Sequence, residues 1–266
     1  WNIEGLRSHA HSLHHFINLT SPSLVFISEP QIYQCDITTS LQSISPHYLY
    51  HLNSEDSYNE SLALVKSKAK GGTLLLWPSS LDPFITILPT PTPSLLPCRL
   101  TMPGLATSYH IGMYLPTAGQ DDLFTSALSA LDVMLTDLNE KHDGQSPIFL
   151  RGDANASSKN IFRSSLLHHF LIKHDLHRLH ISHLTYHHFV GNGLFDSDLD
   201  VVLYSNTPGA SEKLTNIICK FENPLIDSLH DIIISEFTLP SAPPPLRPPT
   251  PHPTPIYPHQ SKVRYI

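Results

Sequence analysis

Asp153 and Asn155, at the end of a short apolar run, are the residues of this sequence best suited to chemistry. Residues 148–150 are all apolar, which is typical of a buried strand, and Gly152 after them permits a sharp backbone turn. A carboxylate there can take a proton from water, and an amide can donate hydrogen bonds to an oxyanion. The alternative interpretation is an Asx turn that ends the strand.

Other polar residues occupy the same kind of position along the chain. Seven of them follow or interrupt strand-like runs: Asn2, Glu29, Tyr114, Asp153, Asn155, Asp200 and His230. If these strands share one sheet edge, the side chains meet in one pocket. They would supply a carboxylate for a divalent cation, a base, amide donors and a carboxylate beside a histidine. This set predicts metal-assisted hydrolysis of a phosphodiester, and its oxygen ligands favour Mg²⁺ or Mn²⁺ over zinc.

Each of these residues also has a structural interpretation. Asn2 can be a turn residue that follows a strand, and Glu29 can be a solvated residue at a strand end. Tyr114 can be a core aromatic with a satisfied hydroxyl group. Asp200 can be a buried acid that pairs with His230 for structural reasons alone.

The spacing of apolar residues predicts the elements that position these side chains. Helical spacing predicts helices over residues 7–19, 33–43, 120–142 and 160–173, the last with Phe162, Leu166, Leu167 and Phe170 facing inward. Apolar runs predict strands over 23–28, 47–52, 62–65, 72–77, 85–88, 108–115, 148–150, 199–204, 215–221 and 232–237. The prolines of 89–97 predict a loop or irregular edge. Interleaved strands and helices predict an α/β fold with two packed sheets and helices outside.

The composition excludes several classes of protein. The 266 residues carry a formal net charge of -7, which does not favour holding nucleic acid by bulk electrostatics. Cys35, Cys98 and Cys219 form no CxxC pair, so they indicate neither a zinc knuckle nor a disulfide framework. No membrane span or signal peptide is visible. We therefore expect an intracellular protein of a reducing compartment, the nucleus or cytoplasm, with no membrane partner.

The sequence resembles the endonuclease/exonuclease/phosphatase superfamily over residues 1–239. Seven motifs match in order: WNIEGL, ISEP, GGTLLLW, MYLPT, FLRGDAN, SDLDVVLY and SLHDIIISEF. The segment TYHHFVGNG and the Pro-rich end look most like the endonuclease domain of a non-LTR (LINE-type) retrotransposon. The resemblance implies a deoxyribonuclease-like four-layer α/β/β/α sandwich of two mixed sheets flanked by helices. It also implies a DNA partner and a reverse transcriptase downstream in a parent polyprotein, beyond this sequence.

The resemblance assigns roles on the metal side of the site. Glu29 binds the divalent metal, with Asn2 near it or near the scissile phosphate. Asp153 activates the attacking water, and Asn155 orients that water or the phosphate.

It assigns further roles on the phosphate side. Tyr114 hydrogen-bonds the phosphate. His230 stabilises charge in the transition state, and Asp200 accepts its other ring proton and so fixes its tautomer.

The sequence departs from the superfamily pattern near its last motif. The usual Ser-Asp-His is replaced by Ser228, Leu229 and His230, so a carboxylate on the metal side is lost. Asp231 would face the opposite side of a strand. Trp1 lies inside its motif, so we expect most of the first core strand to be missing.

The expected domain organisation is simple. Residues 1–239 form the catalytic domain with its N-terminal strand truncated, and the Pro-rich residues 240–266 form an extended tail.

Residues 168–188 contain eight histidines, which could bind zinc but better suit a solvated or DNA-facing loop. Residues 185–193 are expected to form part of a substrate-facing loop.

Three functions remain open at this point. The first is a Mg²⁺-dependent endonuclease that nicks DNA. The second is a phosphatase of the same fold that acts on inositol phosphates or lipids. The third is a transposon-derived fragment whose catalysis is weakened, in particular by Leu229.

Overall fold

A computed structural model describes residues 1–42, 47–54, 71–90, 92–142, 145–181, 184–190, 193–218 and 228–242. Its helices are α1 (Leu6–Thr20), α2 (Gln34–Gln42), η2 (Ser79–Phe84, a 3-10 helix), α4 (Asp121–His142) and α5 (Ile161–Lys173). Its strands are β1 (Val25–Ser28), β2 (Tyr48–Asn53), β3 (Thr73–Pro78), β4 (Ile85–Ile87), β5 (Leu95–Leu100), β6 (Ser108–Tyr114), β7 (Ile148–Asp153), β8 (Leu176–Arg178), β9 (Tyr186–Val190), β10 (Gly193–Ser197), β11 (Asp200–Ser205), β12 (Ser211–Ile218) and β13 (Ile232–Thr238).

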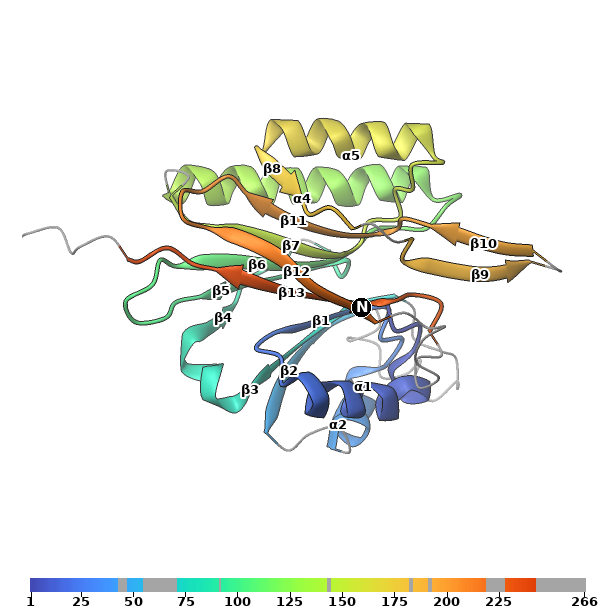
Figure 1. Cartoon of the computed structure of the whole chain (residues 1–266), viewed down its shortest axis with the longest axis horizontal. Helices are drawn as coiled ribbons and strands as arrows, with labels where there is room; N and C mark the ends of the chain where they lie inside the picture. The colour runs from blue at the N-terminus through green and yellow to red at the C-terminus, as the bar shows by residue number, and fades with distance from the viewer. Residues whose placement is uncertain are drawn as a thin grey trace, which may run out of the picture.

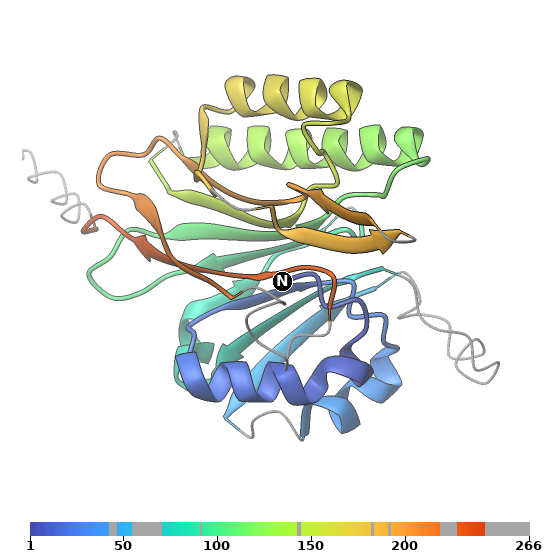
Figure 2. The same ribbon diagram turned by 45° about the vertical axis from the view of Figure 1, so that its right-hand side comes forward.

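These elements form the predicted four-layer α/β/β/α sandwich (Figure 1). One sheet has six strands in the order β4-β5-β6-β7-β11-β8, and β6 and β7 run parallel while the other pairs are antiparallel. A three-stranded sheet, β1-β3-β2, and the β12–β13 pair lie below it. Helices α4 and α5 cover one outer face, and α1 and α2 cover the other (Figures 1 and 2).

Apolar side chains fill each gap between the layers. The stripe on α4 that the sequence predicts packs against the six-stranded sheet, while a second cluster joins α1 and α2 to the three-stranded sheet. A third cluster lies between the two sheets and contains Phe26, Leu75, Trp77, Leu96 and Cys98. The middle layers are therefore fixed against each other, which matters because the site draws residues from both.

Most predicted helices and strands are found within a few residues of their expected positions. The strand expected over 62–65 lies outside the described residues, as do residues 219–227 and most of the tail. Of the Pro-rich segment, Pro240 accepts a hydrogen bond from the amide of Ala106, and Ser241 forms a bridge with Leu105.

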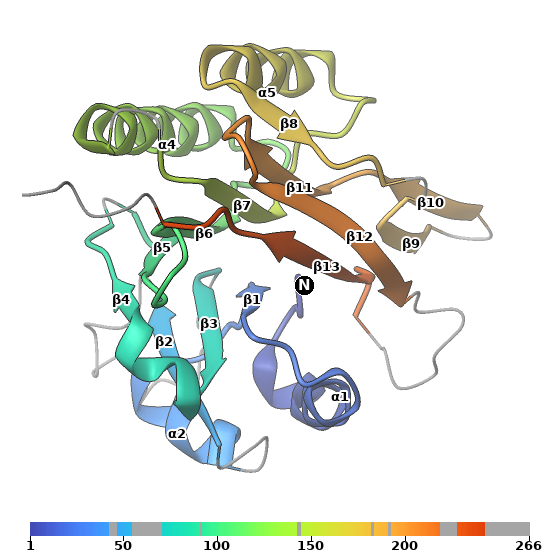
Figure 3. The same cartoon turned by 60° about the vertical axis from the view of Figure 1, so that its left-hand side comes forward.

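The prediction of an irregular edge over 89–97 is wrong at its C-terminal end. Strand β5 begins at Leu95, contains Pro97 and lies between β4 and β6. Strand β4 pairs with β5 as far as Cys98, and just beyond it the carbonyl of Pro97 accepts a hydrogen bond from the N–H of Leu88, which needs no N–H from the proline. Residues 185–193, expected to form part of a loop, instead contain strand β9 and the first residue of β10, an antiparallel pair that projects from one side of the sandwich (Figure 3).

The inward face of α5 also differs from the prediction. Leu167 and Phe170 are buried as expected, but Phe162 is 53% exposed and its neighbour Arg163 is fully buried. Arg163 donates to Asp121 and to the carbonyl oxygens of residues 116, 117 and 155, and its guanidinium lies over the ring of Phe124. Each guanidinium nitrogen of Arg163 therefore has a hydrogen-bond partner, which makes its burial possible. Arg163 thus takes the core position that was expected for Phe162.

Gly152 does not turn the chain, contrary to the expectation. It is the fifth residue of β7, with a φ of 141°. A Cβ atom at this position would lie 1.9 Å from the carbonyl oxygen of Met113 in β6. Glycine is therefore required because the two parallel strands approach closely just before Asp153.

We expect Gly152→Ala to lower the free energy of unfolding by about 3 kcal/mol or more, since backbone must move to admit the methyl group. Gly104 is a matched control: it also has a positive φ, of 77°, but a Cβ atom there would have nothing within 4 Å of it. Gly104→Ala should therefore cost only about 1 kcal/mol. Urea unfolding curves of the two variants test this, and equal losses would contradict the steric explanation.

Candidate active site

One pocket of about 420 Å³ collects most of the side chains that the sequence singles out. Five of the seven predicted residues line it: Asn2, Glu29, Asp153, Asn155 and His230. The other two hydrogen-bond to this set from behind, Tyr114 to Glu29 and Asp200 to His230. The structure thus brings all seven residues together, although they lie far apart along the chain.

Strand register explains how three of these residues come to lie side by side. In the parallel pair β6–β7, Tyr114 lies opposite Asp153. In the antiparallel pair β7–β11, Asp200 lies opposite Asp153. Neighbouring strands therefore present these three side chains level with one another at one edge of the sheet.

Asp153 is the most constrained carboxylate of the site. It is 1% exposed, and it accepts hydrogen bonds from the amide nitrogen of Asn2 (3.0 Å) and from the backbone N–H of Asn155 (2.8 Å). Burial raises the pKa of Asp153 to about 7, an effect that His230 opposes and Asp200 reinforces. A carboxylate with a pKa near neutrality suits a general base.

His230 and Asp200 form a buried ion pair. The Nδ1 atom of His230 lies 2.8 Å from a carboxylate oxygen of Asp200, which leaves Nε2 facing Asp153 at 3.9 Å. Burial disfavours the imidazolium ion, but the attraction and hydrogen bond of Asp200 outweigh it and raise the pKa of His230 to about 9. At neutral pH a cation therefore faces the pocket.

Glu29 enters the pocket from the other sheet. It follows β1 directly and is partly buried. One of its carboxylate oxygens accepts a 2.7 Å hydrogen bond from the hydroxyl group of Tyr114, and the other accepts a 3.1 Å bond from Asn2. Burial and the adjacent Glu29 raise the pKa of Tyr114, so its hydroxyl stays protonated as a donor.

The two amides of the site are already hydrogen-bonded. The Nδ2 atom of Asn2 bridges Glu29 and Asp153, and its oxygen accepts from the backbone of Glu4. Asn2 thus fixes the relative positions of the two carboxylates. The Nδ2 atom of Asn155 donates to the carbonyl of Leu115 at 2.8 Å. The backbone bond from Asn155 to Asp153 is the Asx-type turn that the sequence left as the alternative, and this turn aims Asp153 into the pocket.

Unfavourable backbone conformations gather around the pocket. Glu4, Glu29 and Asn155 line it and have φ values of 52°, 51° and 46°. Left-handed backbone is uncommon for residues other than glycine and costs on the order of 1 kcal/mol each. Strain of this kind is typical of functional sites that the surrounding structure holds in place.

Two residues that sequence reasoning missed also line the pocket. Glu4 accepts a 2.7 Å hydrogen bond from the backbone N–H of Leu229. Lys159 lies with its ammonium group 4.5 Å from the ring centre of Phe195 and donates to the carbonyl of Asp196. Glu4 could have been predicted as a site residue, because it follows Asn2 by two residues in the same motif. Nothing in the sequence distinguishes Lys159 from other surface lysines.

Leu229 contributes its backbone to the site, and Asp231 faces away from it. Asp231 is buried, hydrogen-bonds to Nε2 of His187 at 3.1 Å and lines a different cavity. It therefore does not replace the carboxylate that the usual motif would provide. Glu4 does bring a carboxylate to this side of the pocket.

The donors of the pocket suit a hard cation by their chemistry. Glu4, Glu29 and Asp153 offer carboxylate oxygens, which Mg²⁺ and Mn²⁺ prefer. In the part of the chain that the structure describes, no three His, Cys, Asp or Glu side chains are grouped closely enough to hold a metal ion. In the histidine-rich segment, His174 pairs with Asp132.

Comparison with solved structures identifies the fold. The endonuclease domain of TRAS1, a telomere-specific non-LTR retrotransposon, superposes with a TM-score of 0.62 and 13% identity, over 90% of this chain and 95% of that one. The AP endonuclease LMAP of Leishmania major gives a TM-score of 0.66 and 12% identity, over 91% and 86%. The chain has the endonuclease/exonuclease/phosphatase fold.

The endonuclease/exonuclease/phosphatase fold is shared by phosphatases as well. A mannosyl-6-phosphatase of Bacteroides thetaiotaomicron superposes with a TM-score of 0.55 and 12% identity, over 88% of this chain and 92% of that one. No protein-family model matches the chain, and no curated protein sequence matches it. No helix among the described residues is long and apolar enough to span a membrane.

The Asp200–His230 pair leads to a test of pH dependence in metal-free protein. The pKa of His230 is raised from 6.5 to about 9, so its contribution to stability is complete below pH 6.5 and is lost as the pH rises through about 9. We expect NMR titration to give His230 a pKa near 9, and Asp200→Asn to lower that pKa. The variant should also lose less thermal stability between pH 6.5 and 9 than the parent chain.

A matched control is Asp137→Asn, which removes an exposed carboxylate that pairs with Lys141. It should leave the titration of His230 unchanged. An unshifted pKa in Asp200→Asn would contradict the assignment of the pair as the cause.

Proposed function

We propose that the chain is a divalent-metal-dependent phosphodiester hydrolase that nicks DNA, of the retrotransposon endonuclease type. The observation that carries the proposal is the buried triad in which His230 lies between Asp200 and Asp153. This triad faces the same pocket as the carboxylate of Glu29.

In this proposal the chain's own residues provide a base and a cation. Asp153 removes a proton from water, since its pKa is near neutrality. His230, kept protonated by Asp200, stabilises negative charge on the phosphate in the transition state. Asn155 lines the pocket and orients the phosphate, while Tyr114 holds Glu29 in place from behind, and together they supply the positioning that phosphoryl transfer needs most.

Glu29 would bind Mg²⁺ or Mn²⁺, and the carboxylate of Glu4 lines the same pocket. When bound, the ion supplies positive charge beside the phosphate oxygens. Asn2 would then act as a positioning residue, because its amide nitrogen already joins Glu29 and Asp153.

The choice of DNA as substrate rests on the structural neighbours and on local charge. The TRAS1 and LMAP proteins are endonucleases by name, and a 3′ phosphatase from Neisseria, NExo, was solved with a product DNA hairpin. Since the net charge of the chain is -7, binding to DNA would depend on the metal and on cations at the rim such as Lys159. The domain limits of 1–239 and 240–266 and a downstream reverse transcriptase stay predictions.

The alternative is a phosphatase that acts on inositol phosphates or lipids. The similarity to a mannosyl-6-phosphatase favours it, because the same pocket chemistry suits a phosphate monoester. A catalytically weakened fragment is the third possibility, and the missing carboxylate at position 229 is the observation behind it.

Supercoiled plasmid incubated with Mg²⁺ discriminates among these functions. We expect nicking by the parent chain, and a loss of at least about 100-fold in Asp153→Asn and in His230→Gln, which remove the base and the cation. Lys141→Ala changes an exposed helix residue and should retain full activity.

Other outcomes would reject or redirect the proposal. Nicking that persists in both variants would refute the assigned site. Phosphate release from soluble inositol phosphates without nicking would select the phosphatase. The absence of any turnover, with a broad melting transition, would select the weakened fragment.

A second test concerns the metal side of the pocket. Glu4→Gln keeps the shape of the side chain but removes a charge, so the Mg²⁺ concentration for half-maximal activity should rise about tenfold. Leu229→Asp restores the carboxylate of the usual motif and should lower that concentration. An unchanged Mg²⁺ dependence in both variants would show that neither position contacts the metal.

A further inference from the structure

His187 lies in strand β9 and contacts carboxylates from two other segments of the chain. Its Nδ1 atom lies 2.8 Å from a carboxylate oxygen of Asp196 in β10, and its Nε2 atom lies 3.1 Å from a carboxylate oxygen of Asp231. Both ring nitrogens are therefore engaged, and the ring is fixed from two sides. His187 is not among the residues that line the active-site pocket, so any effect it has on the site must pass through its neighbours.

The backbone around His187 pairs with the segment that carries His230. The N–H of His187 donates to the carbonyl of Leu229, and the N–H of Asp231 donates to the carbonyl of Thr185, both at 2.8 Å. These bonds form an isolated antiparallel bridge rather than a long strand ladder. Because the backbone pairing is so short, side-chain contacts matter more for the position of this segment than they would in a ladder.

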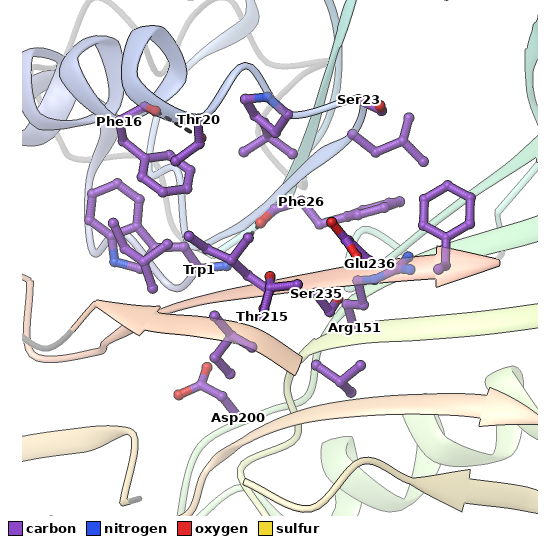
Figure 4. Close-up of a pocket in the computed structure, with 18 of the residues that line it drawn as sticks. Trp1, Phe16, Thr20, Ser23, Phe26, Arg151, Asp200, Thr215, Ser235 and Glu236 are labelled. Atoms are coloured by element: carbon purple, nitrogen blue, oxygen red, sulfur yellow. Dashed lines mark hydrogen bonds between the residues drawn. The ribbon is translucent and has the colours of Figure 1, made fainter. Parts of the chain in front are cut away.

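This bridge directs its side chains to two opposite faces. Tyr186 and His230 lie opposite each other, their ring centres are 4.9 Å apart, and both line the active-site pocket. Neighbouring residues point to the other face, where His187 and Asp231 meet as a diagonal cross-strand pair. There Asp231, together with Asp200, lines a second cavity of about 410 Å³ (Figure 4). The imidazole of His230 and the His187–Asp231 pair thus lie on opposite faces of one bridge.

We propose that His187 is a positioning residue that holds the imidazole of His230 in its orientation. Asp196 anchors the ring of His187, whose other nitrogen binds Asp231, the residue that follows His230. A rotation of this segment that moved the ring of His230 would also carry Asp231 away from His187, so the pair opposes that rotation. The inference rests on the proposed function only for its effect on catalysis, since the orientation of His230 can be measured without substrate.

The charges around His187 make its contact with Asp231 the stronger of the two. Burial disfavours the imidazolium ion, but the hydrogen bonds and charges of Asp196 and Asp231 outweigh it and raise the pKa of His187. The side chain of Asp231 is fully buried, and a buried carboxylate is strongly destabilised when its cationic partner is removed. The side chain of Asp196 is 30% exposed, so water screens that contact. The structure therefore predicts that the Asp231 contact has the larger effect on His230.

Two amide substitutions of His187 separate its two contacts. In His187→Gln, the side-chain nitrogen takes the place of Nε2 and can still donate a hydrogen bond to Asp231. In His187→Asn, the shorter side chain places its nitrogen near the position of Nδ1, so it can donate to Asp196 but does not reach Asp231. Because both variants lose the positive charge, a difference between them reports on the Asp231 contact alone.

The orientation of His230 is measured first, by NMR of the protein without metal or DNA. The ring of Tyr186, with its centre 4.9 Å away, shifts the imidazole proton resonances of His230 by an amount that depends on orientation. We expect these resonances to move in His187→Asn and to stay close to their parent positions in His187→Gln. With supercoiled plasmid and Mg²⁺, kcat should fall at least about tenfold in His187→Asn and less than about threefold in His187→Gln, with KM unchanged in both.

Each contrary result has a defined meaning. Resonances of His230 that move equally in both variants, or in neither, would overturn the inference. A rise in KM at constant kcat would overturn it as well, because His187 would then act on substrate binding. If the parent chain does not nick DNA, the proposed function fails, while the resonances still decide whether His187 positions His230. If His187→Asn does not fold, Asp231→Ser and Asp196→Ser replace it, and the inference requires that only Asp231→Ser lower kcat or move the resonances.

Discussion

The antiparallel register of β7 and β11 sets the geometry of the active-site pocket. It places two carboxylates, Asp153 and Asp200, opposite each other in a buried setting. Two negative charges this close raise the free energy of the folded state unless a cation lies between them. His230 is that cation. It holds the strand ends together and opposes the rise in the pKa of Asp153 that burial causes and Asp200 reinforces.

The site is also the place where the two halves of the sandwich are joined. Asn2 belongs to the lower layers with Glu29, yet its side chain reaches Asp153 of the six-stranded sheet. Ser28 donates from β1 to the carbonyl of Met113 in β6, next to the close approach at Gly152. Stability and site geometry are coupled here, since any shift between the sheets moves Glu29 relative to Asp153.

A second cavity, lined by residues of β1 and β13, lies behind this junction. The cavity between them is lined by Asp200 and by Asp231, the neighbour of His230. Trp1 lines this cavity and Asn2 lines the active-site pocket, and hydrogen bonds from residues 1–3 to β1 hold both in place.

Features that depend on neighbouring residues in the chain could be predicted from the sequence, and features that depend on contacts between distant residues could not. The stripe on α4 and the polar residues at strand ends could be predicted, because periodicity and chain order encode them. Strand β5 was missed because a proline normally excludes pairing, and only the short neighbour β4 makes it tolerable. Arg163 was missed because its partners are backbone carbonyls of distant residues, which no pattern in α5 reveals.

Apolar periodicity and the order of polar residues along the chain are enough to predict the α/β class of the fold and the kinds of side chain available for phosphate chemistry. The close strand approach at Gly152 and the position of Glu4 in the pocket are visible only in the folded chain. The physical reason is that propensity and burial act on neighbouring residues, whereas register and packing between layers join residues that are far apart in the chain.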